Sequence, residues 1–292
     1  MKYDILPPIG ANVLADPGWV KSFAQAAEEL GYDGIATSEH VVWVEGFDVS
    51  NFPYGDVPVT DLTTMYADPL ELLAYLAAVT TRIDLVTATI VLPQQNPVVW
   101  AKRLATLDVL SGGRLRVGVG VGWNREEMET CGEVYTNRGA RANEAMELMR
   151  VLWSGPTTQP QSYSGKHYGF AGVFCNPKPV RGDIPMFMGG SSEAAAIRAG
   201  RLGDGLQPLL LEGEDLTKMV ELMRREAAAA GRDADALEVI LRRSLNEVTP
   251  SSLADDVSRG CTRIILSGSK TTDLDLAITQ MREFATRMGL KA

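Results

Sequence analysis

The chain has 292 residues, enough for one large α/β barrel or for two average domains. Apolar residues make up 45% and charged residues 22%, with a formal net charge of −9, so the composition is that of a globular protein and argues against broad affinity for nucleic acid. No run of about 18 apolar residues occurs and the first residues lack the pattern of a signal peptide, so we expect no membrane partner and a cytoplasmic location.

Short β-branched runs alternate with longer helical patterns, which is typical of βα units on a parallel sheet. The predicted strands span residues 3–6, 34–37, 83–89, 115–119, 185–188, 205–209, 237–241 and 263–266. The predicted helices span residues 18–30, 69–80, 97–110, 137–153, 192–203, 215–230 and 273–288. No linker divides the chain. Eight strands with intervening helices predict an α/β fold, a single (β/α)8 TIM barrel over residues 1–292.

Two segments are longer than a plain barrel needs. Residues 41–67 follow the second predicted strand and are rich in aromatic residues, Pro, Gly and Asp. Residues 155–182 follow the helix after the fourth strand and contain SYSGKHYGFAGVFCNP, which could form a hairpin. Long loops in compact domains tend to be functional lids or inserts. We therefore expect residues 41–67 to lie at the C-terminal rim of the barrel, where such folds have their active sites.

The three cysteines, Cys131, Cys175 and Cys261, are far apart and form no C-x-x-C pair. They predict isolated thiols, with neither a disulfide framework nor a zinc site. The only histidines are His40 and His167, too few for a metal-dependent hydrolase, so we predict no metal. His167 falls in the predicted hairpin, where a surface position is the simpler interpretation.

The second predicted strand ends in IATSEH, which carries Ser38, Glu39 and His40 to the barrel mouth. An imidazole there can transfer a proton near neutral pH or neutralise charge that builds up on a substrate. A histidine that is only hydrogen-bonded at a loop entrance is the alternative. The neighbouring carboxylate favours a functional role, because perturbed charged groups gather at sites.

A fifth strand runs into Gly189-Gly190-Ser191-Ser192, directly before a helix. Free backbone N–H groups and the positive end of the helix dipole make such a corner an anion site. The two glycines would let a phosphate approach the backbone, and a serine could add a hydroxyl. A simple N-terminal helix cap, with Ser followed by Glu193, is the alternative.

The segment RLRVGVGVGWNREE raises the question of a dinucleotide-binding loop. Gly118, Gly120 and Gly122 run G-x-G-x-G, so the third glycine comes one position too early for the fingerprint. No acidic residue stands convincingly about 20 positions beyond. The glycines therefore need another explanation.

Four segments supply one through a resemblance: GYDGIATSEH, NPVVWAKRLATLDVLSGGRLRVGVGVGWNREEMETCG, NRGARANEAMELMRVLWSG and IPMFMGGSSEAAAIRAGRLGDGL. In this order they resemble the bacterial luciferase-like superfamily of flavin- and deazaflavin-dependent oxidoreductases, and in particular the subgroup that uses coenzyme F420. The resemblance covers about residues 31–206. It implies that the glycine-rich segment is the fourth barrel strand, whose small residues leave room beside a cofactor ring.

The resemblance also implies roles at the histidine. It makes His40 an active-site acid or electrostatic partner beside the reactive edge of the ring, with Ser38 in the cofactor pocket. Glu39 would support His40 or line the pocket. Glu126 and Glu127 fall where relatives carry polar groups near the cofactor, although a solvated helix face explains them as well.

For the cofactor, the resemblance implies a cis peptide bond without proline beneath the ring, and Thr89–Ile90 falls at that place. Gly122 and Trp123 would form the exit of the fourth strand beside the ring. The cofactor phosphate would be held by Gly189, Gly190 and Ser191.

The resemblance implies hydride transfer between F420 and a small organic substrate, with His40 handling the proton. Relatives that act on sugar phosphates have a tryptophan at a set distance from the histidine, and Trp43 is displaced from it, so we expect an uncharged or moderately apolar substrate. An FMN-dependent monooxygenase using reduced flavin and O2, and a non-catalytic flavin- or deazaflavin-binding protein, are the alternatives. Relatives are commonly dimers, so we expect a homodimer formed by helices near strands two to four, such as residues 97–110.

Overall fold

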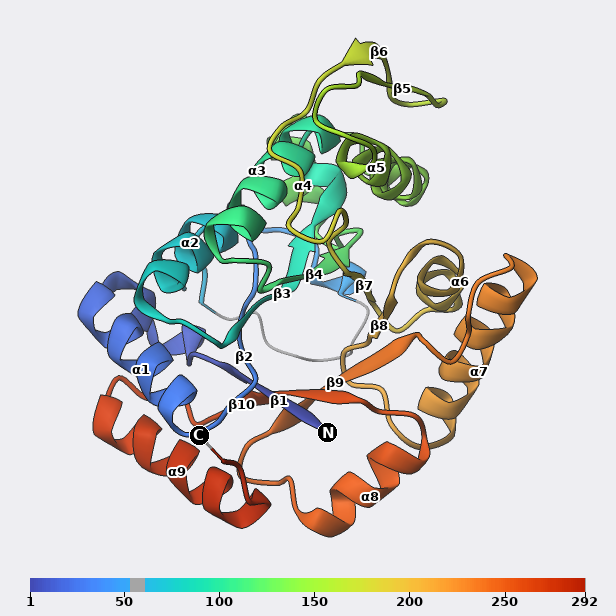
Figure 1. Ribbon diagram of the computed structural model, residues 1–292. Helices are drawn as coiled ribbons and strands as arrows, with labels where there is room; N and C mark the ends of the chain where they lie inside the picture. Colours follow the sequence, from blue (N-terminus) through green and yellow to red (C-terminus); the bar gives the residue numbers. More distant parts are fainter. Residues whose placement is uncertain (53–60, 292) are drawn as a thin grey trace.

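The computed structural model describes residues 1–52 and 61–291 and has a closed barrel of eight parallel strands surrounded by helices (Figure 1). The barrel strands are β1 (Lys2–Leu6), β2 (Gly34–Thr37), β3 (Asp84–Val91), β4 (Leu115–Gly120), β7 (Met186–Gly189), β8 (Gly205–Gln207), β9 (Glu238–Ser244) and β10 (Arg263–Ser267). Around the barrel they follow the order β1, β10, β9, β8, β7, β4, β3, β2. The predicted (β/α)8 barrel is confirmed.

The helices connect successive strands on the outside of the barrel (Figure 1). They are α1 (Pro17–Glu29), α2 (Pro69–Val79), α3 (Pro97–Leu110), α4 (Arg125–Thr130), α5 (Arg138–Trp153), α6 (Glu193–Leu202), α7 (Gly213–Ala229), α8 (Pro250–Ser258) and α9 (Leu274–Met288). The helix periodicity found seven of them but missed α4 and α8. These two are short, and α8 has only two large apolar residues, Leu253 and Val257, so its pattern is too weak to stand out.

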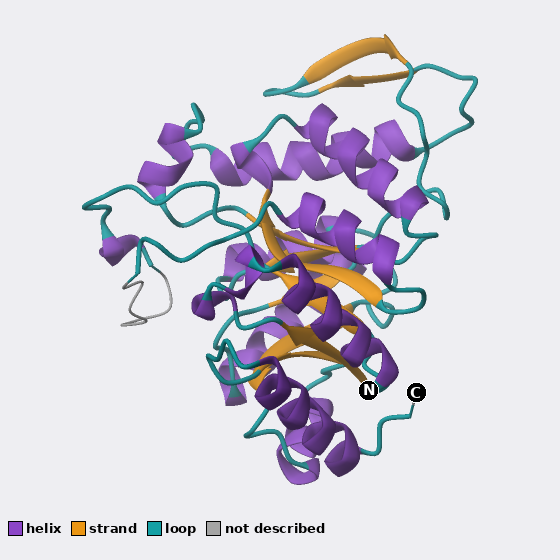
Figure 2. Cartoon of the chain, turned by 90° about the vertical axis from the view of Figure 1, so that its left-hand side faces the viewer, coloured by secondary structure: helices purple, strands orange, loops and turns teal. Residues whose placement is uncertain are grey.

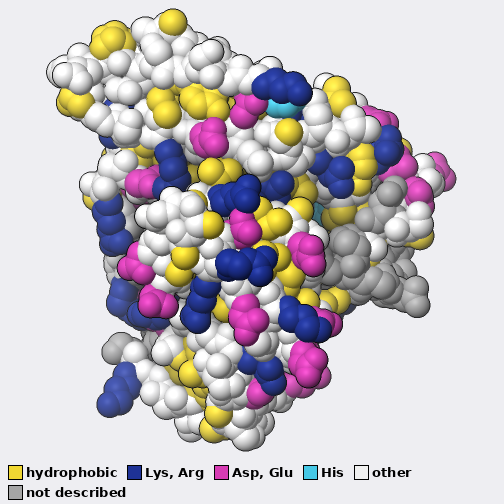
Figure 3. All heavy atoms as spheres, turned by 90° about the vertical axis from the view of Figure 1, so that its right-hand side faces the viewer, with side chains coloured by type: hydrophobic (Ala, Val, Ile, Leu, Met, Phe, Trp, Pro, Cys, Tyr) yellow, Lys and Arg dark blue, Asp and Glu magenta, His cyan; other side chains and the backbone are white. Residues whose placement is uncertain are grey.

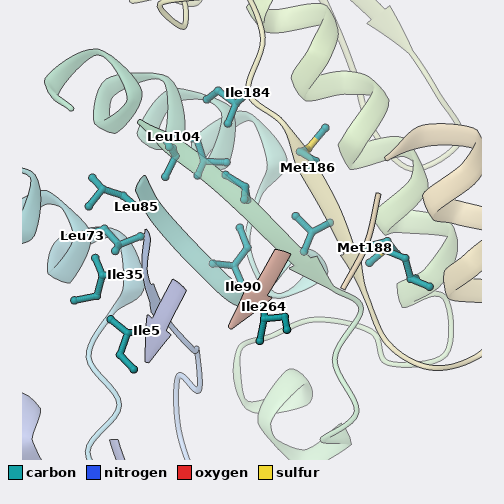
Figure 4. Close-up of a cluster of buried hydrophobic side chains, with 14 of the residues drawn as sticks. Ile5, Ile35, Leu73, Leu85, Ile90, Leu104, Ile184, Met186, Met188 and Ile264 are labelled. Atoms are coloured by element: carbon teal, nitrogen blue, oxygen red, sulfur yellow. The ribbon is translucent and has the colours of Figure 1, made fainter. Parts of the chain in front are cut away.

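The strands have two apolar faces, one toward the helices and one toward the barrel axis. The larger core lies between strands and helices and includes Ile5, Ile35, Leu85 and Ile264 (Figure 4). A smaller cluster fills the barrel interior; its members are Leu6, Ile9, Ala36, Val86, Phe187, Ile240 and Ile265. Strand residues alternate between the two faces, so the register decides which side chains reach the barrel mouth.

Ion pairs close the barrel at the N-terminal ends of its strands. Arg263 donates to Asp4 at 2.5 Å and to Asp84 at 2.7 Å, and its side chain is only 4% exposed. Arg116 contacts both carboxylate oxygens of Glu238 at 2.8 Å. These charges lie opposite the mouth, so they serve the fold rather than a ligand bound there.

The second insertion forms the hairpin expected from the sequence. Strands β5 (Gln161–Ser164) and β6 (Gly169–Val173) pair antiparallel and stand away from the barrel (Figure 2). The first insertion contains a short 3-10 helix, Val49–Asn51, and residues 53–60 of it lie outside the described part of the chain. All three cysteines are free thiols, of which Cys175 and Cys261 are buried.

The face over α6 and α7 mixes acidic and basic side chains without a single-sign patch (Figure 3). Within residues 1–52 and 61–291, every helix is too short or too polar to cross a membrane. Helix α3 exposes Val99 and Leu110, at 49% and 69%, which is compatible with the expected homodimer. The homodimer and the cytoplasmic location stay predictions.

Candidate active site

A cavity of about 1030 Å³ opens at the C-terminal mouth of the barrel. Nine of the ten predicted site residues line it: Ser38, Glu39, His40, Thr89, Gly122, Trp123, Gly189, Gly190 and Ser191. The exception is Ile90, whose fully buried side chain belongs to the core between strands and helices (Figure 4). The segment IATSEH at the end of the second predicted strand therefore reaches the barrel mouth, as the sequence predicted.

His40 is held by a carboxylate from a distant part of the chain. Its Nδ1 lies 2.9 Å from Oε2 of Glu127, and Oε1 of Glu127 accepts the backbone N–H of Val41 at 2.6 Å. The side chains of His40 and Glu127 are 16% and 2% exposed. Because the carboxylate accepts, the geometry assigns the Nδ1–H tautomer, which leaves Nε2 free to exchange a proton.

Aromatic rings enclose this imidazole. Trp43 stacks on it with ring centroids 4.0 Å apart, and Tyr66 meets it edge-on at 5.0 Å. Trp123 approaches edge-on at 6.1 Å and also packs against Phe47. The rings restrict the imidazole to one orientation and reduce the access of water to it.

Glu39 is not the partner of His40. Its Oε2 instead accepts the N–H of Val91 at 2.5 Å. Burial raises the pKa of Glu39 to about 8, and the neighbouring carboxylates of Asp68 and Glu127 add to the effect. Glu39 lines the cavity, as one of the two expectations had it, and at neutral pH its carboxyl is mostly protonated.

Glu127 was underestimated by the sequence analysis. A solvated helix face is wrong for this residue, because it is 1% exposed and paired with His40. Asn124 caps α4 by accepting the N–H of Glu127 at 3.0 Å, which fixes the first turn beneath the imidazole. Glu126 points elsewhere and accepts the N–H of Asp48 at 3.3 Å.

The glycines of β4 and β7 make room for side chains at the mouth. A Cβ on Gly120 would meet Oγ1 of Thr89 at 2.9 Å, and one on Gly189 would meet Cγ2 of Thr89 at 2.7 Å. A Cβ on Gly118 would meet Oε1 of Gln207 at 2.0 Å and the backbone oxygen of Thr87 at 2.2 Å. The glycine-rich strand therefore seats Thr89 and Gln207 side by side under the cavity.

A cis peptide bond without proline lies at this place, but it joins Ala88 to Thr89. The prediction of Thr89–Ile90 was wrong by one bond. The pairing of β3 with β4 shifts register between Thr87 and Ile90, an irregularity that the residue pattern of the strand does not indicate.

The other end of the cavity is built for an anion. The N-termini of α5 and α6 both reach it, through residues 137–140, 190–192, 194 and 195. The N-terminus of α5 has no side-chain cap; the N–H of Arg138 is bound by the backbone oxygen of Tyr135, and the N–H groups of Gly139 and Ala140 remain available. Gly190 has φ +113°, a backbone conformation that favours glycine and leaves the backbone bare.

Ser191 and Ser192, between β7 and α6, make different hydrogen bonds. The hydroxyl of Ser191 donates to the backbone oxygen of Leu209 at 2.6 Å, so its proton is already committed. Ser192 caps α6 by accepting the N–H of Ala195 at 3.3 Å, and its own proton stays available. The capping interpretation therefore holds for Ser192, and the corner keeps free N–H groups as well.

Two arginines flank the same end. Arg138 donates to the backbone oxygen of Gly122 at 2.8 Å, and Arg198 donates to Oδ1 of Asn143 at 2.5 Å. Burial lowers the pKa of Arg198, and the adjacent charge of Arg138 lowers it further. Among the described residues neither guanidinium has a carboxylate partner. Two adjacent cations beside two helix N-termini suit a phosphate group.

Comparison with known proteins agrees with this geometry. Residues 7–247 match the family model described as luciferase-like monooxygenase. The chain belongs to this family. Among curated relatives of this luciferase-like protein, an uncharacterized protein of Mycobacterium tuberculosis is 31% identical over 268 residues, covering 91% of this chain and 92% of the relative.

A second relative is the F420-dependent glucose-6-phosphate dehydrogenase of Mycolicibacterium smegmatis, 30% identical over 269 residues, which covers 89% of this chain and 74% of the relative. Two solved structures share the fold. Monooxygenase RslO1 from Streptomyces bottropensis has a TM-score of 0.76 and 22% identity, with 99% and 98% of the chains covered. An F420-dependent secondary alcohol dehydrogenase, in complex with an F420–acetone adduct, has a TM-score of 0.74 and 18% identity, with 98% and 99% covered.

The site of this luciferase-like protein fits a flavin or deazaflavin. Gly120 and Gly189, which pack against Thr89, form a cradle with it at the wall of the cavity, and the anion end suits a phosphate tail. Buried polar atoms without partners among the described residues, such as Oε1 of Gln207 and Nε1 of Trp43, are available to a ligand in the cavity. The residues present therefore fit such a cofactor.

Proposed function

We propose that the protein is an oxidoreductase that transfers a hydride between coenzyme F420 and a small organic substrate. The relative at 30% identity that is named for F420 supports the cofactor. The observation that carries the proposal is the buried pair of His40 and Glu127 at a cavity whose far end holds two arginines with no carboxylate partner in the described part of the chain.

The chain would bind the cofactor at two places. The free N–H groups of α5 and α6, with Arg138 and Arg198, would hold the phosphate tail. The glycine cradle around Thr89 would hold the ring. When bound, the deazaflavin accepts or donates the hydride, and the protein supplies binding and orientation.

His40 would handle the proton of the reaction. Glu127 keeps Nδ1 protonated, so Nε2 can accept a proton from a substrate hydroxyl or return one to a carbonyl oxygen. Trp43 and Tyr66 hold the imidazole of His40 in one orientation, so that this side chain loses little further freedom when the reaction takes place.

Titration of the purified protein tests the proposal, with the fluorescence of Trp43 and Trp123 as the signal. F420, the same deazaflavin without its phosphate tail, and FMN would each be added. We expect tight binding of F420 and weaker binding of FMN. Arg138→Gln should lower the affinity for F420 about ten-fold and leave the affinity for the deazaflavin without its tail unchanged. Arg225→Gln is the matched control, because this side chain is 72% exposed on α7.

Two outcomes would select the alternatives. Tight binding of FMN alone, with consumption of O2 once the flavin is reduced, would favour the monooxygenase to which the family description refers. Tight cofactor binding without turnover of any carbonyl, alcohol or alkene substrate would favour a non-catalytic binding protein.

A further inference from the structure

Arg242 lies at the barrel mouth and has no part in the site as described so far. It belongs to β9, where Val239 and Leu241 face the helices and Ile240 faces the barrel axis. Alternation therefore points Arg242 inward, one layer above Ile240, and its side chain lines the cavity. The inward residues next to it are Ile240 on β9 and Ile265 on β10, both apolar, and Gln207 on β8, which is an uncharged amide.

Within residues 1–52 and 61–291, the guanidinium of Arg242 has no carboxylate partner and its nitrogens make no hydrogen bond. The adjacent Arg243, which faces the other way, is bound by both oxygens of Asp256 at 3.1 and 2.7 Å. Burial lowers the pKa of Arg242, yet arginine stays charged in proteins. A partly buried, unpaired cation costs free energy, and an anion from outside the chain would remove that cost.

The other charged groups at the mouth that we can place interact with residues other than Arg242. Lys270 lies over Gly10 and interacts with Asp61, whose pKa it helps to lower. Glu127 is bound to His40. The ionisable neighbour of Arg242 is Tyr66, which also packs its ring against His40. Arg242 and His40 are thus both neighbours of one tyrosine.

The position of β9 separates Arg242 from the cofactor end. Around the closed barrel β9 is four strands from β3 in either direction, so Arg242 faces Thr89 across the mouth. The tail arginines of the proposed cofactor site lie on α5 and α6, the helices that follow β4 and β7. A ligand held by Arg242 would therefore meet the ring from the opposite side, close to His40.

We propose that Arg242 binds a carboxylate of the substrate, and that the substrate class is a small organic acid with a reacting carbonyl or alcohol carbon. This inference rests on the proposed function and revises the expectation of an uncharged substrate, which took no account of Arg242. The fork of a guanidinium binds a carboxylate through two parallel hydrogen bonds, which would orient the acid as well as hold it.

Benzoate and benzamide test the inference, because they have the same shape and differ in charge. Their binding to the wild-type protein, Arg242→Gln and Arg225→Gln would be measured by calorimetry and by tryptophan fluorescence, with F420 affinity measured on the same samples. We expect the wild type and Arg225→Gln to prefer benzoate by about ten-fold or more. Arg242→Gln should lose the preference while its thermal unfolding and F420 affinity stay unchanged.

Equal affinity for the two compounds, no binding of either, or a preference that survives in Arg242→Gln would overturn the inference. Tighter binding of phenyl phosphate than of benzoate would overturn the carboxylate assignment. If F420 still binds in these cases, the subsite is wrong and the proposed function stands. If benzoate is preferred through Arg242 but no deazaflavin binds, the proposed function fails instead.

Discussion

Replacing Glu127 by Gln should impair the proposed reaction without disturbing the cofactor site. Both oxygens of this carboxylate accept hydrogen bonds, one from Nδ1–H of His40 at 2.9 Å and one from the N–H of Val41 at 2.6 Å. An amide has one oxygen and one NH2 group, so it can accept only one of them. If the oxygen stays with Val41, the NH2 group faces Nδ1 and favours the tautomer with the proton on Nε2.

The size of the effect follows from the burial of the pair. A hydrogen bond to a buried charged group contributes about 1.5–3 kcal/mol. At 1.36 kcal/mol for each factor of ten in rate, losing it lowers kcat about 10- to 100-fold. Reversal of the tautomer in a buried acid–histidine pair can cost more than the hydrogen bond alone. We expect kcat to fall about 100-fold and the Kd of F420 to change less than two-fold.

The chain offers a clean measurement of the tautomer, because it contains only His40 and His167. With ¹⁵N-labelled histidine, NMR should give the Nδ1–H form for His40 in the wild type and the Nε2–H form in Glu127→Gln. His167, at the hairpin, is the internal reference. Glu126→Gln is the matched control on the same helix, and it should leave both kcat and the tautomer unchanged.

The reasoning fails if Glu127→Gln keeps wild-type kcat, or if His40 has the same tautomer in both proteins. Equal losses of kcat in Glu126→Gln and Glu127→Gln would also refute it, because only one of these carboxylates touches His40.

Three further predictions concern stability. The pKa of Glu39 is raised to about 8 from a usual 4.5, so the folded state keeps a proton that the unfolded state loses, and the free energy of unfolding should fall as the pH rises from about 4.5 to 8. Glu39→Gln should flatten this pH dependence in urea titrations. An unchanged pH dependence would contradict the assignment. Gly118→Ala should lower the free energy of unfolding by about 1–3 kcal/mol or more, because the new Cβ would overlap the side chain of Gln207 and the backbone oxygen of Thr87. Gly268→Ala should have little effect on Tm, because its Cβ would lie 3.4 Å from Oε1 of Gln280. Arg263→Leu should cost about 3–5 kcal/mol in chemical denaturation, because it leaves Asp4 and Asp84 without a partner at the barrel floor; a smaller loss than for the exposed Arg225→Gln would refute that role.

The fold could be predicted because its pattern is local. Eight β-branched runs with helices between them suffice to predict a barrel, and the strand bounds agree within about three residues, with the largest difference at the C-terminal end of β9. The helix α8 escaped because its stability comes from tertiary contacts, such as the pair of Asp256 with Arg243, rather than from an apolar stripe.

The site was harder because its pairs are distant in sequence. Glu39 stands next to His40, but the two side chains bind different partners, so adjacency in the sequence was a poor guide. The true partner is Glu127, 87 positions away. Arg242 was missed because the predicted strand, residues 237–241, ended one position before it, whereas β9 continues to Ser244.

The charges of the cavity favour an enzyme over a carrier. The chain has a net charge of −9, yet the cavity contains arginines without a carboxylate partner among residues 1–52 and 61–291 at two places, Arg138 with Arg198 at one end and Arg242 across the mouth. The proposed cofactor accounts for the first place, and the proposed acid substrate would account for the second. A protein that only carries the cofactor has no use for another cation, whereas hydride transfer needs two ligands held face to face. We expect a cavity with cations at two places to bind two anions, as the proposed reaction would require.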